Sequence, residues 1–386
     1  MNCDFVIVGA GVMGASIAFQ LAKRNSGRIT VIDKDTVGQG ASGRSSALVR
    51  MHYSFAPEVR LALKSLEMFQ KWEEIVGERG AFRKTGFVQL VPQREMAFLE
   101  ANVRMQKECG VNVELIGCDE LRKLEPEWNL DDEPGVAYEP DSGYGDGSVV
   151  ANDFLTAARK LGVQYQPKTE VTRLLVNGQN AEGVRTSRET IHAPVVIVTT
   201  GQWSRALLET AGVDLPIETE LHYVAILRNA ADMKGAGLAC IDSASTVYFR
   251  GDGTEKTLIG DFYGKGGVDP ENFPRHVEPG WFEEIVERAA KRMPKLENAE
   301  IMRGITGVYD VSPDARPILG EIATVRGLHV AAGFTGMGFK LSPAIGVVMS
   351  ELVLDGVAKT VDITAFRPSR FAEGKLIRPE FEYQDA

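Results

Sequence analysis

A glycine-rich turn between two apolar runs, in the stretch VIVGAGVMGASIAFQLAKRNSGRITVIDKD, constrains the fold of this chain more than any other segment. The run Phe5–Val8 predicts a strand, and residues 15–23 predict a helix directly after the turn. A second strand is expected over Ile29–Ile32, and it ends at Asp33. The turn itself has the spacing G-x-G-x-x-G and is formed by Gly9, Gly11 and Gly14.

Each part of this β-α-β unit has a physical role in dinucleotide binding. Gly9 permits a tight turn, Gly11 lets the backbone approach a pyrophosphate, and Gly14 lets the helix pack close to the strand. The helix N-terminus attracts the anion. Asp33, 19 residues after Gly14, is placed to accept hydrogen bonds from a ribose diol. The segment therefore predicts a dinucleotide site, but it does not by itself distinguish a flavin from a nicotinamide.

The composition is that of a globular protein and narrows the class of partner. A net charge of −10 argues against a nucleic-acid partner, because phosphate binding needs a basic face. The four cysteines show neither metal-ligand spacing nor a disulfide framework, so we expect no metal site and a reducing cytoplasm. No run of 18 apolar residues is present, so no membrane span is expected.

Three later segments favour a large resident cofactor. The polar, glycine-rich loop 38–46 can wrap backbone N–H groups around a pyrophosphate. Residues 195–199 predict a buried parallel strand that ends in TTGQWS. Residues 327–332 predict another strand, followed by GFTGMGFKLSPAIG and a helix from about 342 to 354. The N-terminus of that helix can stabilise negative charge on a cofactor ring.

Taken together, these motifs resemble the D-amino-acid oxidase and sarcosine oxidase family of FAD-dependent amine oxidoreductases. The likeness is greatest to the sarcosine oxidase branch with its β subunits, and it runs from VIVGAGVMG to AAGFTGMGFKLSPAIG. It implies an α/β fold: a Rossmann-type, glutathione-reductase-like FAD-binding domain and a second α+β substrate domain built on an antiparallel sheet. It also implies hydride transfer from the C–N bond of an amino acid or N-alkyl amino acid to flavin N5.

The resemblance implies which residues contact FAD. The glycine motif would hold the pyrophosphate, Asp33 the adenosine ribose, and the backbone of Val171 the adenine. The full set of expected cofactor contacts is Gly9, Gly11, Val12, Met13, Gly14, Asp33, Lys34, Gly40, Ala41, Ser42, Ser45, Ser46, Val171, Gly201, Trp203, Gly333, Gly336, Met337, Gly338, Phe339 and Lys340.

Four residues are candidates for the substrate site. Arg50 and Lys340 match two cations that hold the substrate carboxylate in sarcosine oxidases, and the planar fork of Arg50 suits bidentate binding. The alternative for both is an ordinary solvated cation. Tyr248 would line the active-site wall or belong to the core, and His52 would handle a proton or be a structural histidine.

Two departures from the family pattern bear on the flavin. Gly307 stands where monomeric sarcosine oxidases attach FAD through a cysteine, and no histidine stands near SGRSS, so we expect non-covalent FAD. Leu258 stands where family oxidases keep a lysine, unless Lys256 or Lys265 is the equivalent. A missing lysine favours a dehydrogenase with a protein or quinone electron acceptor over one that uses oxygen.

The nucleotide-facing segments lie far apart in the sequence, so the FAD-binding domain is expected to be discontinuous. Alternating runs at 220–227 and 245–250 predict the antiparallel sheet of the other domain, and 279–292 predicts an amphipathic helix. The acidic stretch 125–146 is expected to be an exposed loop. The expected FAD-binding domain comprises residues 1–87, 149–216 and 317–386, and the substrate domain comprises residues 88–148 and 217–316.

Several functional alternatives remain open at this point. An FAD-dependent 2-hydroxy-acid dehydrogenase would use the same carboxylate anchors. A flavin-carrying subunit that is active only with a partner subunit is a second alternative, and a nucleotide-binding scaffold without catalysis is a third. The sequence does not distinguish among glycine, N-methyl glycines, D-amino acids, cyclic imino acids and opines as substrate.

Overall fold

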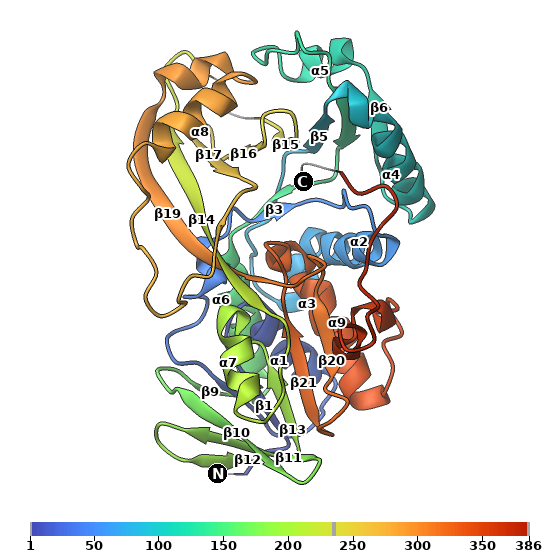
Figure 1. Cartoon of the computed structure of the whole chain (residues 1–386), viewed down its shortest axis with the longest axis vertical. Coiled ribbons are helices and arrows are strands. Elements are labelled where there is room, and N and C mark those ends of the chain that lie inside the picture. The colour runs from blue at the N-terminus through green and yellow to red at the C-terminus, as the bar shows by residue number, and fades with distance from the viewer. Residues whose placement is uncertain (1, 234–236, 384–386) are drawn as a thin grey trace.

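The computed structural model describes residues 2–233 and 237–383, and Figure 1 shows two sheets in opposite halves of the molecule. One is a six-stranded sheet with the order β20-β21-β13-β1-β2-β9, parallel except at the β20 edge. The predictions for β1 and β2 are confirmed at both ends. The strands are β1 (Phe5–Val8), β2 (Ile29–Ile32), β9 (Gln164–Gln166), β13 (Val195–Val198), β20 (Ile318–Glu321) and β21 (Leu328–Ala332).

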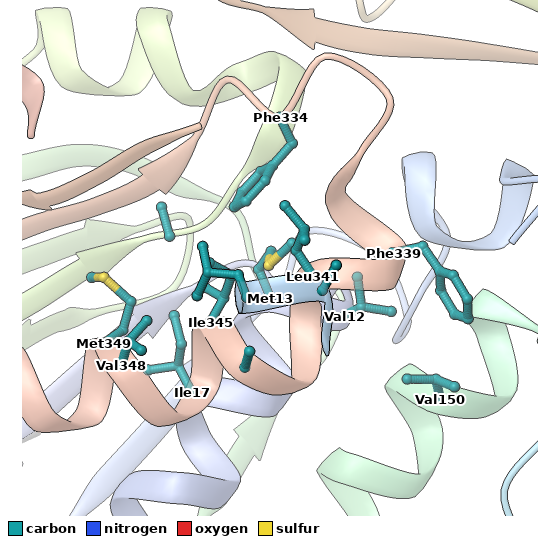
Figure 2. Packing of buried hydrophobic residues seen from close by; sticks show 14 of the residues in the cluster. Val12, Met13, Ile17, Val150, Phe334, Phe339, Leu341, Ile345, Val348 and Met349 are labelled. Atoms are coloured by element: carbon teal, nitrogen blue, oxygen red, sulfur yellow. The ribbon is translucent and has the colours of Figure 1, made fainter. Parts of the chain in front are cut away.

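Helices cover one face of this sheet, and a small sheet covers the other. Apolar side chains of four helices pack together under the first face: α1 (Val12–Lys23), α2 (Ala56–Gln70), α6 (Gly147–Lys160) and α9 (Gly338–Asp355). Figure 2 shows the centre of this packing, where Met13 and Ile17 of α1 meet Ile345 and Val348 of α9. The second face is covered by α7 (Ser204–Glu209), β10 (Val171–Asn177), β11 (Asn180–Thr186) and β12 (Thr190–His192).

The second large sheet has nine strands in the order β18-β14-β17-β16-β15-β5-β7-β6, with β19 paired to β14. We predicted an antiparallel sheet; it is mixed, because β5 and β15 pair in parallel where two distant segments meet. Its strands are β5 (Phe87–Val91), β6 (Glu114–Ile116), β7 (Gly135–Glu139), β14 (Glu218–Arg228), β15 (Ala239–Asp242), β16 (Val247–Gly251), β17 (Lys256–Asp261), β18 (Lys265–Gly266) and β19 (Glu300–Val311).

Helix α8 (Trp281–Ala290) packs its apolar side on the large sheet, as its amphipathic pattern predicted. The remaining elements are one longer helix of 13 residues and several short pieces. They are α3 (Trp72–Val76), α4 (Met96–Glu108), α5 (Cys118–Leu124), β3 (Leu48–Val49), β4 (Arg83–Lys84) and β8 (Gly143–Tyr144), with 3₁₀ turns at Ala41–Arg44, Gln93–Glu95, Gly201–Trp203, Pro294–Asn298, Thr364–Phe366 and Pro368–Arg370. None of the helices in the described ranges is long and apolar enough to cross a membrane.

The expectation of an exposed loop over 125–146 is wrong. The segment contributes β7 to the large sheet and β8 to a small one, and the carboxyl groups of Glu125 and Glu139 are buried. The acidic turns on either side dominate the composition of the segment, so the short apolar run GVAYE was not predicted as a strand. It forms β7, which lies between β5 and β6 and pairs with both.

The six-stranded sheet takes its strands from three separate stretches of chain, and the nine-stranded sheet takes its strands from the two stretches between them. This arrangement supports a proposal of two discontinuous domains. The proposed boundaries are the predicted ones: 1–87, 149–216 and 317–386 for FAD, and 88–148 and 217–316 for the substrate.

Candidate cofactor and substrate site

A cavity of about 740 Å³ lies where β1, β2 and β13 end, and its lining includes Val8, Ile32 and Thr199. This is the edge at which α/β sheets bind their ligands. The volume falls in the range of cofactor and small-molecule sites, about 300–1,000 Å³. The lining then continues along the loop 39–45 to the N-terminus of α9 and to Tyr309, so the cavity spans both halves of the molecule.

The glycine turn at one side of the cavity packs too closely for side chains. Gly9 has φ +106°, and a Cβ there would lie 2.5 Å from the carbonyl oxygen of Thr199. A Cβ on Gly14 would lie 1.9 Å from the carbonyl oxygen of Gly9. Helix α1 begins at Val12 rather than at residue 15, and the Val12 N–H donates to Ser42 Oγ at 3.1 Å. The helix N-terminus is thereby held at the wall of the cavity.

Asp33 is fixed by the backbone at the end of β2. Its Oδ2 accepts from the N–H of Ala10 at 2.7 Å, and its Oδ1 accepts from the N–H of Asp35 at 2.8 Å. Burial raises the pKa of Asp33 above its ordinary value, although both backbone hydrogen bonds oppose the rise. Each carboxylate oxygen keeps a free lone pair, so the group can still accept hydrogen bonds from a ribose diol.

Trp203 and Lys34 form part of the lining beside Asp33. The Lys34 ammonium lies 3.9 Å from the centroid of the Trp203 ring and pairs with the carboxylate of Glu271. The indole N–H of Trp203 is buried and has no acceptor among the described residues. Because buried donors are normally satisfied, this orphaned N–H indicates a polar ligand in the cavity.

The far end of the cavity lies at the start of α9. Residues 333–337 form the turn, and a Cβ on Gly336 would lie 2.5 Å from the ring of Tyr309. Helix α9 begins at Gly338, four residues earlier than predicted, and no side chain caps it. The Asp310 carboxylate accepts from the N–H of Gly333 at 2.6 Å, and burial raises the pKa of Asp310 to about 6.

The lining contains most of the residues expected to contact the cofactor. All of them line the cavity except Gly14, Ser46, Gly333, Met337 and Lys340. Gly14 and Met337 instead pack helices α1 and α9 into the structure. For every residue of the expected set, whether it lines the cavity or not, contact with the cofactor stays a prediction.

Arg50 and Lys340 lie close to each other, and Lys340 is not a solvated cation. Lys340 is 7% exposed, and its pKa lies well below the usual lysine value because of burial and then because of the charge of Arg50. The guanidinium of Arg50 lies 4.5 Å from the centroid of the Tyr53 ring and donates to the carbonyl oxygen of His52. The buried carboxylate of Glu58 is the acid that partly offsets the charge of Lys340.

Tyr248 connects the large sheet to the cavity. Burial raises its pKa well above the ordinary value, and the neighbouring side chains of Ser46 and Tyr309 also act on it. Burial also raises the pKa of Tyr309 to about 12. The ring of Tyr309 stacks on His222 with 4.0 Å between centroids, and His222 in turn pairs with Glu220 at 2.9 Å.

His52 is buried, outside the cavity lining, and hydrogen-bonded to another side chain. Burial, and then the charge of Arg50, lowers the pKa of His52 to about 3, so the ring is neutral at physiological pH. Its Nε2 lies 2.7 Å from the Tyr383 hydroxyl. The structural interpretation of this histidine is the one that the geometry supports.

Gly307 and Leu258, the two departures from the family pattern, lie outside the cavity lining. A Cβ on Gly307 would lie 3.3 Å from Cβ of Arg44, whose Nη1 donates to the carbonyl oxygen of Thr306 at 3.0 Å. Leu258 packs in a small apolar cluster on β14, β17 and β19. Lys265 is exposed and pairs with Glu278, and neither it nor Lys256 is found in the cavity lining.

Sequence reasoning missed part of the lining. Tyr309 received no role, although it stands two residues after Gly307, a position that the sequence analysis discusses. Arg44 lies within the loop that was singled out, but it received no role. Phe273 and Arg275 come from a loop between β18 and α8 that carries no local motif, so only the folded chain shows that they line the cavity.

Comparison with known proteins agrees with this site. A family model described as "DAO: FAD dependent oxidoreductase" matches residues 4–352. FAD-dependent oxidoreductase domain-containing protein 1 of Xenopus laevis is 28% identical, over 96% of this chain and 83% of the relative. Sarcosine oxidase subunit beta of an Arthrobacter species is 26% identical, over 97% and 92%. L-Proline dehydrogenase of P. horikoshii has a TM-score of 0.90 and 26% identity, over 97% and 99%.

The residues present fit FAD, the cofactor of this family. The glycine turn brings bare backbone to the cavity wall at positions where a Cβ would clash, Asp33 presents a carboxylate, and the orphaned N–H of Trp203 lies in the same lining. Two helix N-termini, those of α1 and α9, border the cavity and suit a pyrophosphate and a ring that becomes negatively charged. The chain is therefore an FAD-dependent oxidoreductase of the DAO family.

Proposed function

We propose that the protein oxidises the C–N bond of a small amino acid or N-alkyl amino acid whose carboxylate is held between Arg50 and Lys340. The carrying observation is that buried Lys340, in the first turn of α9, lies within range of the charge of half-buried Arg50, which follows β3. Like charges repel in an environment of low dielectric. The carboxylate of Glu58 favours the charged form of Lys340, but it also pairs with Arg316. A substrate carboxylate between the two cations would complete the charge balance.

The position of this pair relative to the cavity supports the proposal. Lys340 is the third residue of α9, and the first two, Gly338 and Phe339, line the cavity. Tyr309 lines the same end, and Tyr248 is its neighbour. A substrate anchored by its carboxylate would therefore have its amine end near the cofactor.

Bound FAD supplies the hydride acceptor, and the chain supplies orientation and charge. The two cations fix the carboxylate, and half-buried Tyr309, with buried Tyr248 behind it, gives hydroxyl groups that orient the rest of the substrate. Because the pKa of Tyr309 is about 12, its hydroxyl stays protonated at neutral pH and does not act as a base. Tyr309 is therefore assigned to orienting the substrate and not to accepting the proton of the amine.

The names of the relatives favour an amine as substrate. The Arthrobacter relative is a subunit of a sarcosine oxidase, and the P. horikoshii structure is an L-proline dehydrogenase, so both names refer to secondary amino acids. We propose a substrate of that class. We also propose that FAD is bound non-covalently, because residue 307 is glycine. The electron acceptor is either oxygen or a protein or quinone. Leu258 favours the second kind of acceptor.

A second candidate is a flavin-carrying subunit that works only with a partner subunit. The likeness to a sarcosine oxidase subunit beta over 92% of that protein favours it. Such a subunit would bind FAD and carboxylates in isolation but would not be reduced by amino acids. A partner is therefore proposed only if the holoprotein stays oxidised with every substrate offered.

Binding of acetate to the FAD-loaded protein tests the anchor, with the flavin absorbance as readout. Arg50→Met and Lys340→Met should each raise the acetate Kd by about 10–100-fold, since a hydrogen bond to a charged group contributes about 1.5–3 kcal/mol. FAD should stay bound. Arg159→Met and Lys291→Met, at exposed positions, are the matched controls. An unchanged Kd in both anchor variants would defeat the proposal.

A further inference from the structure

The last described segment, residues 376–383, lies across the loop that carries Arg50. In Figure 1 it is the dark red trace that runs past α2 towards α4. Its backbone is fixed at two points: the N–H of Ile377 donates to Asp314 Oδ2 at 3.0 Å, and the carbonyl oxygen of Phe381 accepts from Asn102 Nδ2 at 2.9 Å. The ring of Phe381 also meets Phe98 edge to face, with 6.0 Å between centroids.

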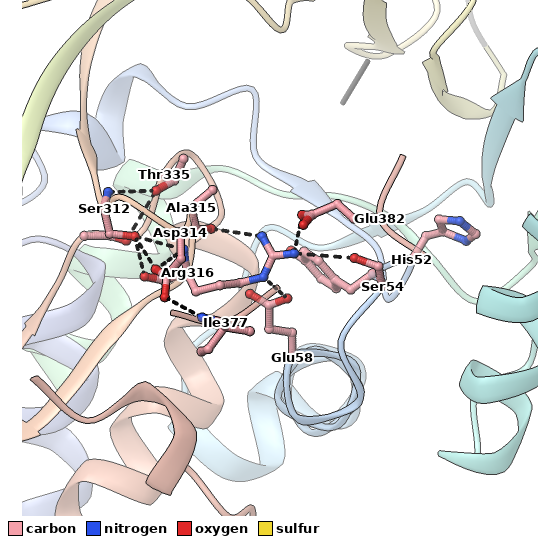
Figure 3. A network of polar contacts seen from close by, with 12 residues as sticks. His52, Ser54, Glu58, Ser312, Asp314, Ala315, Arg316, Thr335, Ile377 and Glu382 are labelled. Carbon is pink, nitrogen blue, oxygen red and sulfur yellow. Dashed lines mark hydrogen bonds and ion pairs between the residues drawn. The ribbon is translucent and has the colours of Figure 1, made fainter. Parts of the chain in front are cut away.

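The side chains of this segment extend the network. Figure 3 shows Glu382 pairing with the guanidinium of Arg316, whose Nε lies 3.1 Å from the buried Glu58 carboxylate. Arg316 also donates to Ser54 Oγ at 3.4 Å. Segment 376–383 is thereby tied to the same buried charges that surround the carboxylate anchor.

The contact closest to the anchor is made by Tyr383. Its hydroxyl lies 2.7 Å from His52 Nε2, and the two rings are nearly parallel with 5.8 Å between centroids. The two side chains are buried, at 9% and 2% exposure. Water therefore cannot readily replace the hydrogen bond if the hydroxyl is removed, and the imidazole nitrogen would be left unpaired.

His52 is in turn joined to Arg50. The Arg50 Nη1 donates to the carbonyl oxygen of His52, while Arg50 Nε has no acceptor in the described part of the chain. The direction of the guanidinium therefore depends on where the backbone of residue 52 lies. The hydrogen bond to Tyr383 fixes the side chain of that same residue.

The loop has other supports, so loss of one hydrogen bond should not unfold it. The N–H of Met51 donates to Glu139 Oε2 at 2.9 Å, and the carbonyl oxygen of Tyr53 accepts from Gln106 Nε2 at 3.2 Å. These contacts lie on either side of His52. The Tyr383 hydroxyl is left as the support of residue 52 itself.

We propose that Tyr383 is a positioning residue for the substrate carboxylate. Through His52 it holds the guanidinium of Arg50 in the direction that binding requires. This inference rests on the proposed role of Arg50 as carboxylate anchor. It gives segment 376–383, which lies far from the cofactor motifs in the sequence, a function at the substrate site.

The test compares Tyr383→Phe with the matched control Tyr263→Phe, a tyrosine that is 62% exposed. Both are measured as FAD-loaded proteins, with acetate as the carboxylate probe and flavin absorbance as readout. Tyr383→Phe should raise the acetate Kd by about 3–10-fold, the effect of one uncharged hydrogen bond. With an amino-acid substrate, KM should rise by a similar factor while kcat changes less than twofold. Tyr263→Phe should change neither constant.

A double-mutant cycle separates positioning from a merely structural role. In a His52→Phe background, which removes the imidazole partner of the Tyr383 hydroxyl, the further change Tyr383→Phe should have no effect on the acetate Kd. An acetate Kd equal to that of the unmodified protein in Tyr383→Phe overturns the inference, and so does an equal rise in both backgrounds. If the unmodified protein fails to bind acetate at all, or Arg50→Met binds it normally, the proposed anchor itself is overturned.

Discussion

Glu125 follows helix α5 and accepts a hydrogen bond from the N–H of Leu238 at 2.6 Å. The carboxyl group is buried, and a Cβ on Gly237 would lie 2.5 Å from it. Burial raises the pKa of Glu125 to about 7 from its ordinary value of 4.5, although the hydrogen bond opposes the rise. The folded protein therefore keeps this proton over a pH range in which the unfolded chain has released it.

The sign of the resulting pH dependence follows from proton counting. Between pH 4.5 and about 7 the folded state binds more protons at residue 125 than the unfolded state, so the free energy of unfolding falls as pH rises. Glu125→Gln should remove this part of the slope. The gain in the free energy of unfolding over the unmodified protein should be larger at pH 8 than at pH 4.5, by about 1–3 kcal/mol. Urea unfolding of both proteins at both pH values measures this difference in the free energy of unfolding.

The matched control is Glu297→Gln, at an exposed position. It should leave the pH dependence of stability as it is in the unmodified protein. A Glu125→Gln protein with the same slope as the unmodified one would show that Glu125 is ionised in the folded state at neutral pH.

At the scale of elements, the cofactor edge depends on how closely α1 approaches β1. The nearest atom to a Cβ on Gly14 would be the carbonyl oxygen of Gly9, at 1.9 Å, and backbone cannot move aside as a flexible side chain can. Gly14→Ala should therefore shift the start of α1, cost about 1–3 kcal/mol or more in stability, and lower FAD occupancy.

The ratio of flavin to protein absorbance after purification measures that occupancy. Gly266→Ala is the control, since nothing lies within 4 Å of its Cβ position in strand β18. Full occupancy in Gly14→Ala would show that the close approach of helix and strand is not needed for cofactor binding.

The sequence predicted short elements well where local pattern decides, and less well where tertiary contacts decide. Strands β1 and β2 were predicted at both ends because apolar β-branched runs bounded by turn residues leave few choices. The predicted start of helix α9 is four residues late, because the prediction places Gly338 before the helix, whereas Gly338 is its first residue. In the structure the glycines around the start of α9 pack against Tyr309 and Met13, which no local pattern reveals.

At the scale of the whole molecule, the site is assembled from segments that are distant in sequence. Gly9, Thr199 and Gly338 come from the three stretches that build the six-stranded sheet, and their order around the cavity follows from the parallel strand pairing. The motifs predicted this much. The contribution of residues 269–275 and of residues 376–383 could not be predicted, because both are irregular segments positioned only by long-range contacts.

The central claim is that this flavoprotein takes electrons from an amino acid. The most direct measurement is the visible absorption spectrum of the FAD-loaded protein, sealed from air, as L-proline, sarcosine, glycine, D-alanine and lactate are added in turn. We predict that the flavin bands bleach with at least one of the amino acids and not with lactate; readmitting air then separates an oxidase, which recovers its colour at once, from a dehydrogenase. Bleaching by lactate alone, or a protein that cannot take up FAD, would contradict the account.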